Sequence, residues 1–451
     1  MYNYLVSKGI LHPNQFGFRK SHSTSHALNY SISEIQKSLN KNNHVLGIYI
    51  DLSKAFDTID HAKLLSKLST YGIRGNAHAL LTSYLSNRTQ YTKVLDECSE
   101  KLFIRYGVPQ GSVLGPLLFL VYINDIGNCS NLGVFVLFAD DTNIFVVGRN
   151  ADDVYDKANT ILQSVCRYMK ANELHINMSK CCYMHFRPKK RLFKDGEVSN
   201  RTLQIMGVPV KHEKSTRFLG VIIDENLSWQ PHIDNLTQKL NCQVGILNRI
   251  KDDVPQRFHK DLYYTLFESH LSYCINVWGG VAPVKLNPLF VVQKRCIRIL
   301  FGDKETYFEK FETCARCRPL NNQIHGEEFY CLEHTKPIFN NLEIMTVHNI
   351  YSYHCVIGLL KILKFRLPIS LYSQFELSKR KDTLLLTPTP SINFIYKSSV
   401  LWNSLRTKLS MVDFSINVNS TKSKLKTLIL SNQSSGDADE WSDYNYNILN
   451  C

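Results

Sequence analysis

The chain has 451 residues, of which 44% are hydrophobic and 20% are charged, so it is globular rather than intrinsically disordered. Its 53 Lys and Arg residues exceed its 39 Asp and Glu residues, and the net charge of +14 favours a polyanionic partner. The apolar runs are too short to cross a bilayer and the chain opens without a signal-peptide pattern, so we predict neither a membrane protein nor a secreted one. The 13 cysteines, an odd number, are then expected to be free thiols in the reducing environment of the nucleus and cytoplasm.

The first part of the chain predicts one strand among helices. Residues 23–39 have apolar side chains at helical spacing after a Ser/Thr-rich start, which predicts a helix. Residues 45–50 form an apolar run of strand length that ends at Asp51. Two further helices are predicted at 61–71 and 77–85.

A glycine-rich segment follows at residues 107–116 and leads into an apolar helix predicted at 117–126. Glycine lets a backbone approach a ligand closely, and Pro116 suits the first turn of a helix. Gln110 and Ser112 place hydrogen-bonding groups before that helix. An ordinary loop in front of a core helix explains the same pattern. The segment therefore indicates a functional site only in combination with the acidic segments on either side of it.

Two apolar runs, 134–138 and 143–147, flank the pair Asp140-Asp141, which predicts a hairpin with two carboxylates at its tip. Taken alone, such a pair is better explained as a solvated turn. If the strand ending at Asp51 lies beside this hairpin, three carboxylates converge and repel one another. Oxygen ligands arranged in this way suit two Mg²⁺ ions roughly 4 Å apart, the arrangement used for displacement at phosphorus. The pattern therefore predicts nucleotidyl transfer.

The remaining segments complete an alternating pattern. Residues 154–172 predict a long amphipathic helix, and the order of strands and helices across 45–187 suits a split βαβ unit. Residues 234–300 are rich in helical patterns. The tail at 431–451 is polar and acidic, and we expect it to be disordered.

Taken in order, residues 51–57, 107–116 and 138–141 resemble motifs A, B and C of reverse transcriptases. The residues in these motifs are most similar to those of the non-LTR (LINE-type) retrotransposons of the jockey group. Other segments resemble the stretch before motif A, motif D, motif E and the thumb, namely 14–24, 173–180, 218–221, 229–233 and 277–279. The resemblance implies an α+β right-hand polymerase with a ferredoxin-like palm. The implied parts are partial fingers (1–44), palm (45–233), helical thumb (234–300), a C-terminal region (301–430) and the tail (431–451).

The resemblance also implies an activity and its partners. The chain would be an RNA-directed DNA polymerase that uses an RNA template, a DNA primer and dNTPs. Asp51, the Leu52 carbonyl, Asp140 and Asp141 would bind Mg²⁺, and Lys180 would protonate the departing pyrophosphate.

Further residues would hold the substrates. Phe56 stands where reverse transcriptases place a steric gate against the 2′-hydroxyl, although the sequence alone favours a core aromatic residue. Gln110 and Gly111 would line the floor beneath the nucleotide. Arg19 and Lys20 would contact phosphates, and the segment Phe218-Leu219-Gly220 would grip the primer.

Outside these motifs, Cys314, Cys317, Cys331 and His334 have the spacing of a tetrahedral zinc site. Two unrelated pairs in a cysteine-rich chain would give the same pattern. The spacer matches no knuckle known from retroelements.

The start of the chain, just before Gln15, leads us to expect an N-terminally truncated reading frame. It would lack the preceding fingers hairpin, and a full-length element would carry an endonuclease domain upstream. One alternative is therefore an inactive remnant that only binds RNA or an RNA–DNA hybrid. Another is an RNA-dependent RNA polymerase, but those usually carry Gly-Asp-Asp and a polar residue where Ala139 and Phe56 stand here.

Overall fold

The computed structural model describes residues 1–188, 201–302, 335–375, 377–378, 381–385, 394–405 and 418–435. The chain divides into two compact units, and each is described by itself. Unit 1 contains Met1–Leu219 with Pro368–Ser370, and unit 2 contains Gly220–Leu367 with Leu371–Cys451.

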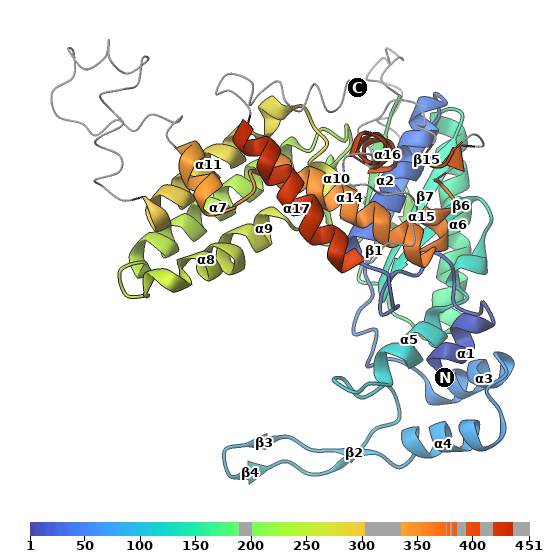
Figure 1. Ribbon diagram of the computed structural model, residues 1–451. Helices are drawn as coiled ribbons and strands as arrows, with labels where there is room; N and C mark the ends of the chain where they lie inside the picture. Colours follow the sequence, from blue (N-terminus) through green and yellow to red (C-terminus); the bar gives the residue numbers. More distant parts are fainter. Residues whose placement is uncertain are drawn as a thin grey trace, which may run out of the picture. The chain divides into compact units, whose positions relative to one another are not determined.

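The centre of unit 1 is a five-stranded sheet with the order β11-β8-β1-β7-β6. Figure 1 labels its strands β1, β6 and β7. The strands of this sheet are β1 (His44–Ile50), β6 (Gly133–Phe138), β7 (Asp141–Gly148), β8 (Cys182–Phe186) and β11 (Lys211–His212). β1 is antiparallel to both β7 and β8, and β6 is antiparallel to β7. Helices connect β1 to β6 and β7 to β8, so these four strands form the ferredoxin-like βαββαβ arrangement. This confirms the α+β fold class and the split βαβ unit.

The central strand β1 has both faces covered, which explains its uninterrupted apolar sequence. All seven of its residues are buried. Leu46, Ile48 and Ile50 belong to the core cluster that includes the buried residues of helix α6. Tyr49 points to the other face, where its ring contacts Phe145 of β7. A strand buried on both faces shows a continuous apolar run rather than an alternating one.

Five helices of unit 1 lie close to their predicted positions, and the short helices at residues 2–7 and 126–129 were not predicted. In chain order the helices are α1 (Tyr2–Ser7), α2 (Thr24–Asn40), α3 (His61–Thr70), α4 (Gly75–Leu85), α5 (Gly115–Ile123), the 3-10 helix η1 (Ile126–Cys129) and α6 (Ala151–Ala171). Side-chain caps fix three of the starts, because Ser23, Asp60 and Asn150 each accept a hydrogen bond from a first-turn N–H. α5 has Pro116 in its first turn, as predicted.

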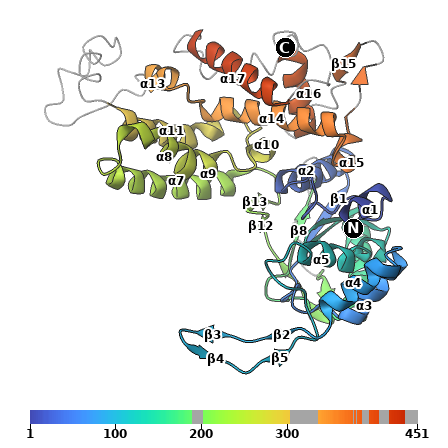
Figure 2. The same cartoon turned by 60° about the horizontal axis from the view of Figure 1, so that its bottom comes forward.

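Short strands occupy the rest of unit 1. A hairpin arm projects between α4 and α5 and consists of β2 (Thr89–Gln90), β3 (Lys93–Val94), β4 (Glu97–Cys98) and β5 (Leu102–Phe103) (Figure 2). A second hairpin pairs β9 (Gln204–Ile205) with β10 (Val208–Pro209). β12 (Ser215–Phe218) ends the unit.

Unit 2 is mainly helical in its described part. It begins with β13 (Val221–Asp224) and contains two long helices, α7 and α11, which pack against each other. Its helices up to residue 301 are α7 (Gln230–Ile250), η2 (Gln256–Phe258), α8 (His259–Leu262), the π-helix η3 (Tyr263–Glu268), α9 (Ser269–Leu271), α10 (Ile275–Trp278) and α11 (Pro283–Phe301). The predicted helix-rich stretch 234–300 lies here; its role as a thumb stays a prediction.

Helix α14, with α16 and α17 packed against it, is the centre of the later elements of the chain. These elements are α13 (Lys336–Asn341), α14 (Val347–Phe365), α15 (Ile369–Tyr372), β14 (Leu377–Ser378), β15 (Lys381–Leu385), α16 (Phe394–Leu405) and α17 (Val418–Ser435). Gln293 of α11 is fully buried and its amide bonds three groups: the Tyr263 hydroxyl, the Met345 carbonyl and the Val347 N–H. None of the described helices has the length and apolar character needed to cross a membrane.

The start of the expected disordered tail was placed wrongly. α17 continues to Ser435, so residues 431–435 are helical. The reason is Gln433, whose buried amide accepts a hydrogen bond from Asn349 and donates one to the Ile344 carbonyl. These contacts hold the end of a helix that composition alone assigns to a tail. Residues 436–451 lie outside the described residues.

Candidate active site

The acidic hairpin tip lies beside the end of β1, as the sequence predicts. Phe138 pairs with Asp141 across the tip, and Ile50 of β1 pairs with Thr142 of β7. Asp51 follows Ile50 directly and is therefore level with Asp141. Ala139 has φ 55°, a left-handed conformation that lets the chain reverse within two residues. The structure thus brings Asp51, Asp140 and Asp141 to one end of the sheet.

The two carboxylates at the hairpin tip have raised pKa values. Burial raises the pKa of Asp141 to about 6, with further contributions from the charges of Asp140 and Asp51. Burial and the charge of Asp51 also raise the pKa of Asp140. The Lys180 ammonium opposes both shifts. Negative charge is therefore concentrated at this site beyond what the nearby cation balances.

Asp51 is held by groups from the segment after α6. The Asn177 side-chain amide donates to Asp51 Oδ2 at 3.1 Å, and Lys180 Nζ lies 3.5 Å from the same oxygen. Lys180 remains mostly exposed, with a side-chain exposure of 67%. Sequence reasoning selected Lys180 but missed Asn177, although Asn177 lies within the segment that resembles motif D.

The backbone at Leu52 is oriented by an antiparallel bridge to Ile176. The two hydrogen bonds of this bridge use the Asp51 carbonyl and the Ser53 N–H. Neighbouring residues of an extended strand direct their carbonyls to opposite edges, so the Leu52 carbonyl points away from this bridge. The bridge therefore does not use the oxygen that the sequence analysis assigns to a metal.

The donor set suits a hard divalent cation in its chemistry. Carboxylate and carbonyl oxygens are the ligands that Mg²⁺ prefers, and a cation would offset the burial and the charge repulsion that together raise the pKa of Asp141. Within the described part of the chain, no group of three or more His, Cys, Asp or Glu side chains is already arranged to hold a metal ion. Mg²⁺ sites commonly use one or two carboxylates and complete their coordination with substrate phosphates and water.

The catalytic turn is supported by a buried glutamine from the N-terminal segment. Gln15 Oε1 accepts hydrogen bonds from the N–H groups of Ala139 (3.0 Å) and Gly17 (2.8 Å), and Gln15 is only 2% exposed. A Cβ at Gly17 would lie 2.3 Å from the Ala139 nitrogen, so only glycine fits there. Gln15 is a positioning residue that sequence reasoning missed, because nothing local links residue 15 to residue 139.

The glycine-rich segment lies against the residues that follow Asp51. Gln110 Nε2 donates to Asp57 Oδ1 at 2.9 Å, and the Val108 N–H donates to the Phe56 carbonyl. A Cβ at Gly107 would lie 2.9 Å from the Asp57 Cα, which explains the glycine. Gly111 is exposed with φ 77°. Motifs A and B are therefore side by side, as a shared nucleotide site requires.

Phe56 is half-buried and stacks on Phe119 of α5 with ring centroids 4.5 Å apart. Its ring also meets Phe18 edge-on at 6.2 Å. Both the core role and the steric-gate role fit this position, because one side of the ring is packed and the residue keeps partial exposure. The gate stays a prediction.

Other predicted site residues have varied surroundings. Arg19 Nη1 donates to the carbonyls of His12 and Gln15, so its guanidinium orders the N-terminal segment. Lys20 is exposed. Phe218 is buried, and Leu219 and Gly220 both have positive φ, as in a tight turn. Phosphate and primer contacts at these positions stay predictions.

The candidate zinc ligands Cys314, Cys317, Cys331 and His334 lie outside the described residues. The cysteines within the described ranges are free thiols.

With this geometry in view, comparison with known proteins is decisive. Residues 1–223 match the family described as "Reverse transcriptase (RNA-dependent DNA polymerase)". This part of the chain is a reverse transcriptase domain. The match includes every residue that forms the acidic site, and it confirms the resemblance drawn from the order of the motifs.

The relatives of this reverse transcriptase domain come from non-LTR elements. The chain is 26% identical over 308 residues to the "Probable RNA-directed DNA polymerase from transposon BS" of Drosophila melanogaster, covering 66% of the chain and 33% of the relative. It is 24% identical over 303 residues to the "RNA-directed DNA polymerase from mobile element jockey" of the same species, covering 64% and 32%. The chain thus spans about a third of the length of these curated relatives.

Among solved structures, apo telomerase from Candida tropicalis aligns with 94% of this chain and 59% of its own. The sequence identity is 11% and the TM-score is 0.37. The assignment of the reverse transcriptase domain rests on the family match and the sheet topology instead.

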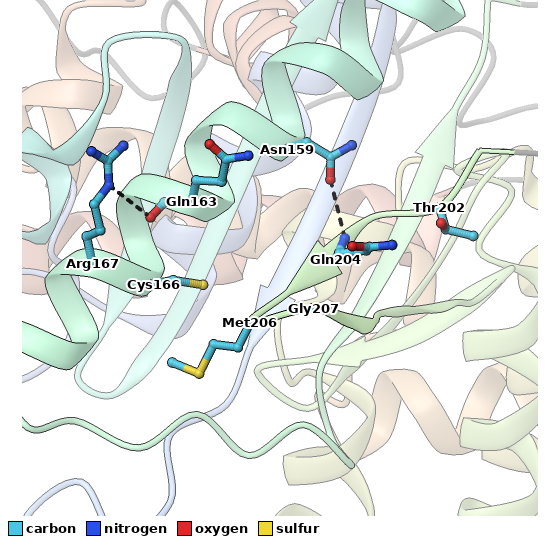
Figure 3. A pocket seen from close by; sticks show the side chains of 8 residues that line it. All are labelled: Asn159, Gln163, Cys166, Arg167, Thr202, Gln204, Met206 and Gly207. Atoms are coloured by element: carbon cyan, nitrogen blue, oxygen red, sulfur yellow. Dashed lines mark hydrogen bonds between the residues drawn. The ribbon is translucent and has the colours of Figure 1, made fainter.

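The reverse transcriptase domain also has a hollow between α6 and the β9–β10 hairpin, with a volume of about 680 Å³ (Figure 3). It is lined by Asn159, Gln163, Cys166, Arg167, Thr202, Gln204, Met206 and Gly207. Asn159 Oδ1 accepts a hydrogen bond from the Gln204 N–H, which ties the hairpin to α6. The lining contains no carboxylate and none of the acidic site residues, so the hollow is separate from the proposed chemistry.

Proposed function

We propose that this chain is the RNA-directed DNA polymerase of a jockey-like non-LTR retrotransposon. It would add dNTPs to the 3′-hydroxyl of a DNA primer that is paired with an RNA template. The observation that carries this proposal is the convergence of Asp51, Asp140 and Asp141 at one end of the palm sheet, with the pKa of Asp141 raised to about 6.

The proposed metal ligands are the carboxylates of Asp51 and Asp140 and the carbonyl of Leu52, with Asp141 completing the charge. Magnesium bound there would activate the primer hydroxyl and neutralise charge on the pyrophosphate. Asn177 fixes the orientation of Asp51 through its hydrogen bond. This bond leaves the second oxygen of the Asp51 carboxylate for a cation.

Other side chains would select and process the nucleotide. Lys180, exposed at the surface beside Asp51, would hold the proton that the pyrophosphate receives as it leaves. Phe56, supported from behind by Phe119, would exclude a 2′-hydroxyl. Gln110, held by Asp57, would line the floor beneath the base.

Primer extension tests this function. The full chain is incubated with poly(rA)/oligo(dT), dTTP and Mg²⁺, beside Asp140→Asn and the control Asp156→Asn, which changes an exposed carboxylate on α6. We expect extension by the parent and the control but none by Asp140→Asn. Binding of the hybrid should be nearly unchanged in all three proteins.

Two outcomes contradict the proposal. Extension by Asp140→Asn at the parent rate would place the chemistry elsewhere. Absence of extension in every protein, with hybrid binding retained, would favour the alternative of a remnant that only binds nucleic acid.

A further inference from the structure

The hairpin arm, residues 88–105, is a second surface of unit 1 that the polymerase chemistry does not use (Figures 1 and 2). Near its base Thr89 pairs with Phe103, and near its tip Lys93 pairs with Cys98. Between these two pairs the outgoing strand has three residues (90–92) and the returning strand has four (99–102). One residue of the returning strand is therefore extra. The Ser99 N–H donates to the Thr92 carbonyl and the Thr92 N–H donates to Ser99 Oγ, so the irregularity lies at residues 100–101, which together face Tyr91.

This register divides the arm into two faces, because side chains alternate along each strand. Tyr91, Lys93, Lys101 and Phe103 share one face, which we call the basic–aromatic face. The ammonium of Lys101 lies 5.9 Å from the centre of the Tyr91 ring, as expected for neighbours on one face. The opposite face carries Val94, Glu97 and Leu102 and is therefore apolar and acidic.

The aromatic side chains of the arm are unusually exposed. Tyr91 is 51% exposed and Phe103 is 71% exposed. All four short strands consist of exposed residues, so the arm has no core of its own. A two-stranded hairpin without a core is marginally stable in water, and exposed rings beside cations indicate a partner.

We propose that the basic–aromatic face binds single-stranded RNA, with bases stacked on Tyr91 and Phe103 and phosphates contacted by Lys93 and Lys101. Aromatic rings between lysines suit unpaired bases joined by phosphates. A protein partner would instead favour the opposite face, where aliphatic side chains stand beside Glu97. The inference rests on the proposed function in one respect, because it identifies the bound RNA as the template.

The test measures binding of a fluorescein-labelled 20-nucleotide oligo(rU) to the full chain by fluorescence anisotropy at 50–200 mM salt. Tyr91→Thr/Phe103→Thr should weaken binding at least tenfold, since one stacked base contributes roughly five- to a hundredfold. Lys93→Gln/Lys101→Gln should reduce the slope of log K against log salt by about 1.4, the value for two phosphates on a single strand.

Val94→Thr/Leu102→Thr is the matched control, because it makes equally large changes on the opposite face of the same strands. It should bind the RNA within about twofold of the parent chain. Circular dichroism verifies that all variants are folded.

Unchanged RNA affinity in the Tyr91/Phe103 variant overturns the inference, and so does an equal loss in the control. Loss of self-association in the Val94/Leu102 variant, with RNA affinity equal throughout, would identify a protein contact instead. The two proposals fail separately. If RNA binding depends on the arm but no protein extends a primer, only the proposed polymerase function is wrong. If primers are extended but RNA binding does not depend on the arm, only this inference is wrong.

Discussion

Replacing Asp141 with asparagine should make the protein more stable while it impairs polymerisation. Burial and the charges of Asp140 and Asp51 raise the pKa of Asp141 from 3.8 to about 6. A rise of this size corresponds to about 3 kcal/mol, and solvent screening at this partly exposed site reduces it to about 1–2 kcal/mol. The asparagine side chain has nearly the same shape as aspartate without the charge, so the Asp141→Asn variant should recover this free energy of unfolding.

The gain in stability should depend on pH in a defined direction. Between pH 4 and pH 6 the folded protein retains a proton on Asp141 that the unfolded chain has lost. The free energy of unfolding of the parent therefore falls as pH rises through this window, relative to the variant. The difference between the two proteins should be close to zero at pH 4 and reach its full size above pH 7.

Calorimetric unfolding of the full chain measures this difference at pH 4, 5.5 and 7.5, with Asp96→Asn as the exposed control. Added Mg²⁺ should stabilise the parent more than Asp141→Asn, because a bound cation relieves the same repulsion. Equal stability of parent and variant at pH 7.5, or a difference that does not change with pH, would refute the reasoning.

Other perturbations test neighbouring parts of the site. Gln15→Leu should slow primer extension about 10–100-fold, because the buried N–H of Ala139 loses its acceptor at a cost of about 1–3 kcal/mol, and an unchanged rate would show that the turn does not depend on Gln15. Phe56→Val should increase ribonucleotide incorporation at least tenfold in a competition assay, and an unchanged ratio would argue for a purely structural ring. Lys180→Leu should lower the single-turnover rate about 100-fold with little change in dNTP affinity, and an unaltered rate would exclude the general-acid role. His185 is buried with its pKa lowered to about 3, so His185→Gln should reduce acid destabilisation below pH 6.5 by about 1.4 kcal/mol per pH unit; parallel unfolding curves would contradict this.

Sequence patterns predicted the palm well because its signals are local or periodic. The apolar run before Asp51 is a strand, and the hairpin tip is confirmed by the pairing of Phe138 with Asp141. Helix starts followed from residues that accept hydrogen bonds through their own side chains, such as Ser23. The sequence predicted that the carboxylates converge if the strand ending at Asp51 lies beside the hairpin. The pairing of Ile50 with Thr142 shows that it does.

Features that depend on distant contacts could not be predicted in this way. Asn177 orients Asp51, although the two are separated by most of the palm. The hairpin arm was missed because strands of two residues have no measurable period. The helical end of α17 depends on the burial of Gln433, which its polar neighbours conceal.

The contacts between the N-terminal segment and the catalytic turn mean that the β6–β7 hairpin does not form its turn alone. The Leu137 N–H bonds the Asn14 carbonyl, and the Ala139 N–H bonds the Gln15 side chain, so the turn is completed by a segment far earlier in the chain. Such a turn cannot mature before the N-terminal segment has docked, and it should be among the last parts of the palm to acquire hydrogen-exchange protection during folding. Anyone transplanting residues 133–148 onto another scaffold would have to transplant residues 14–17 as well.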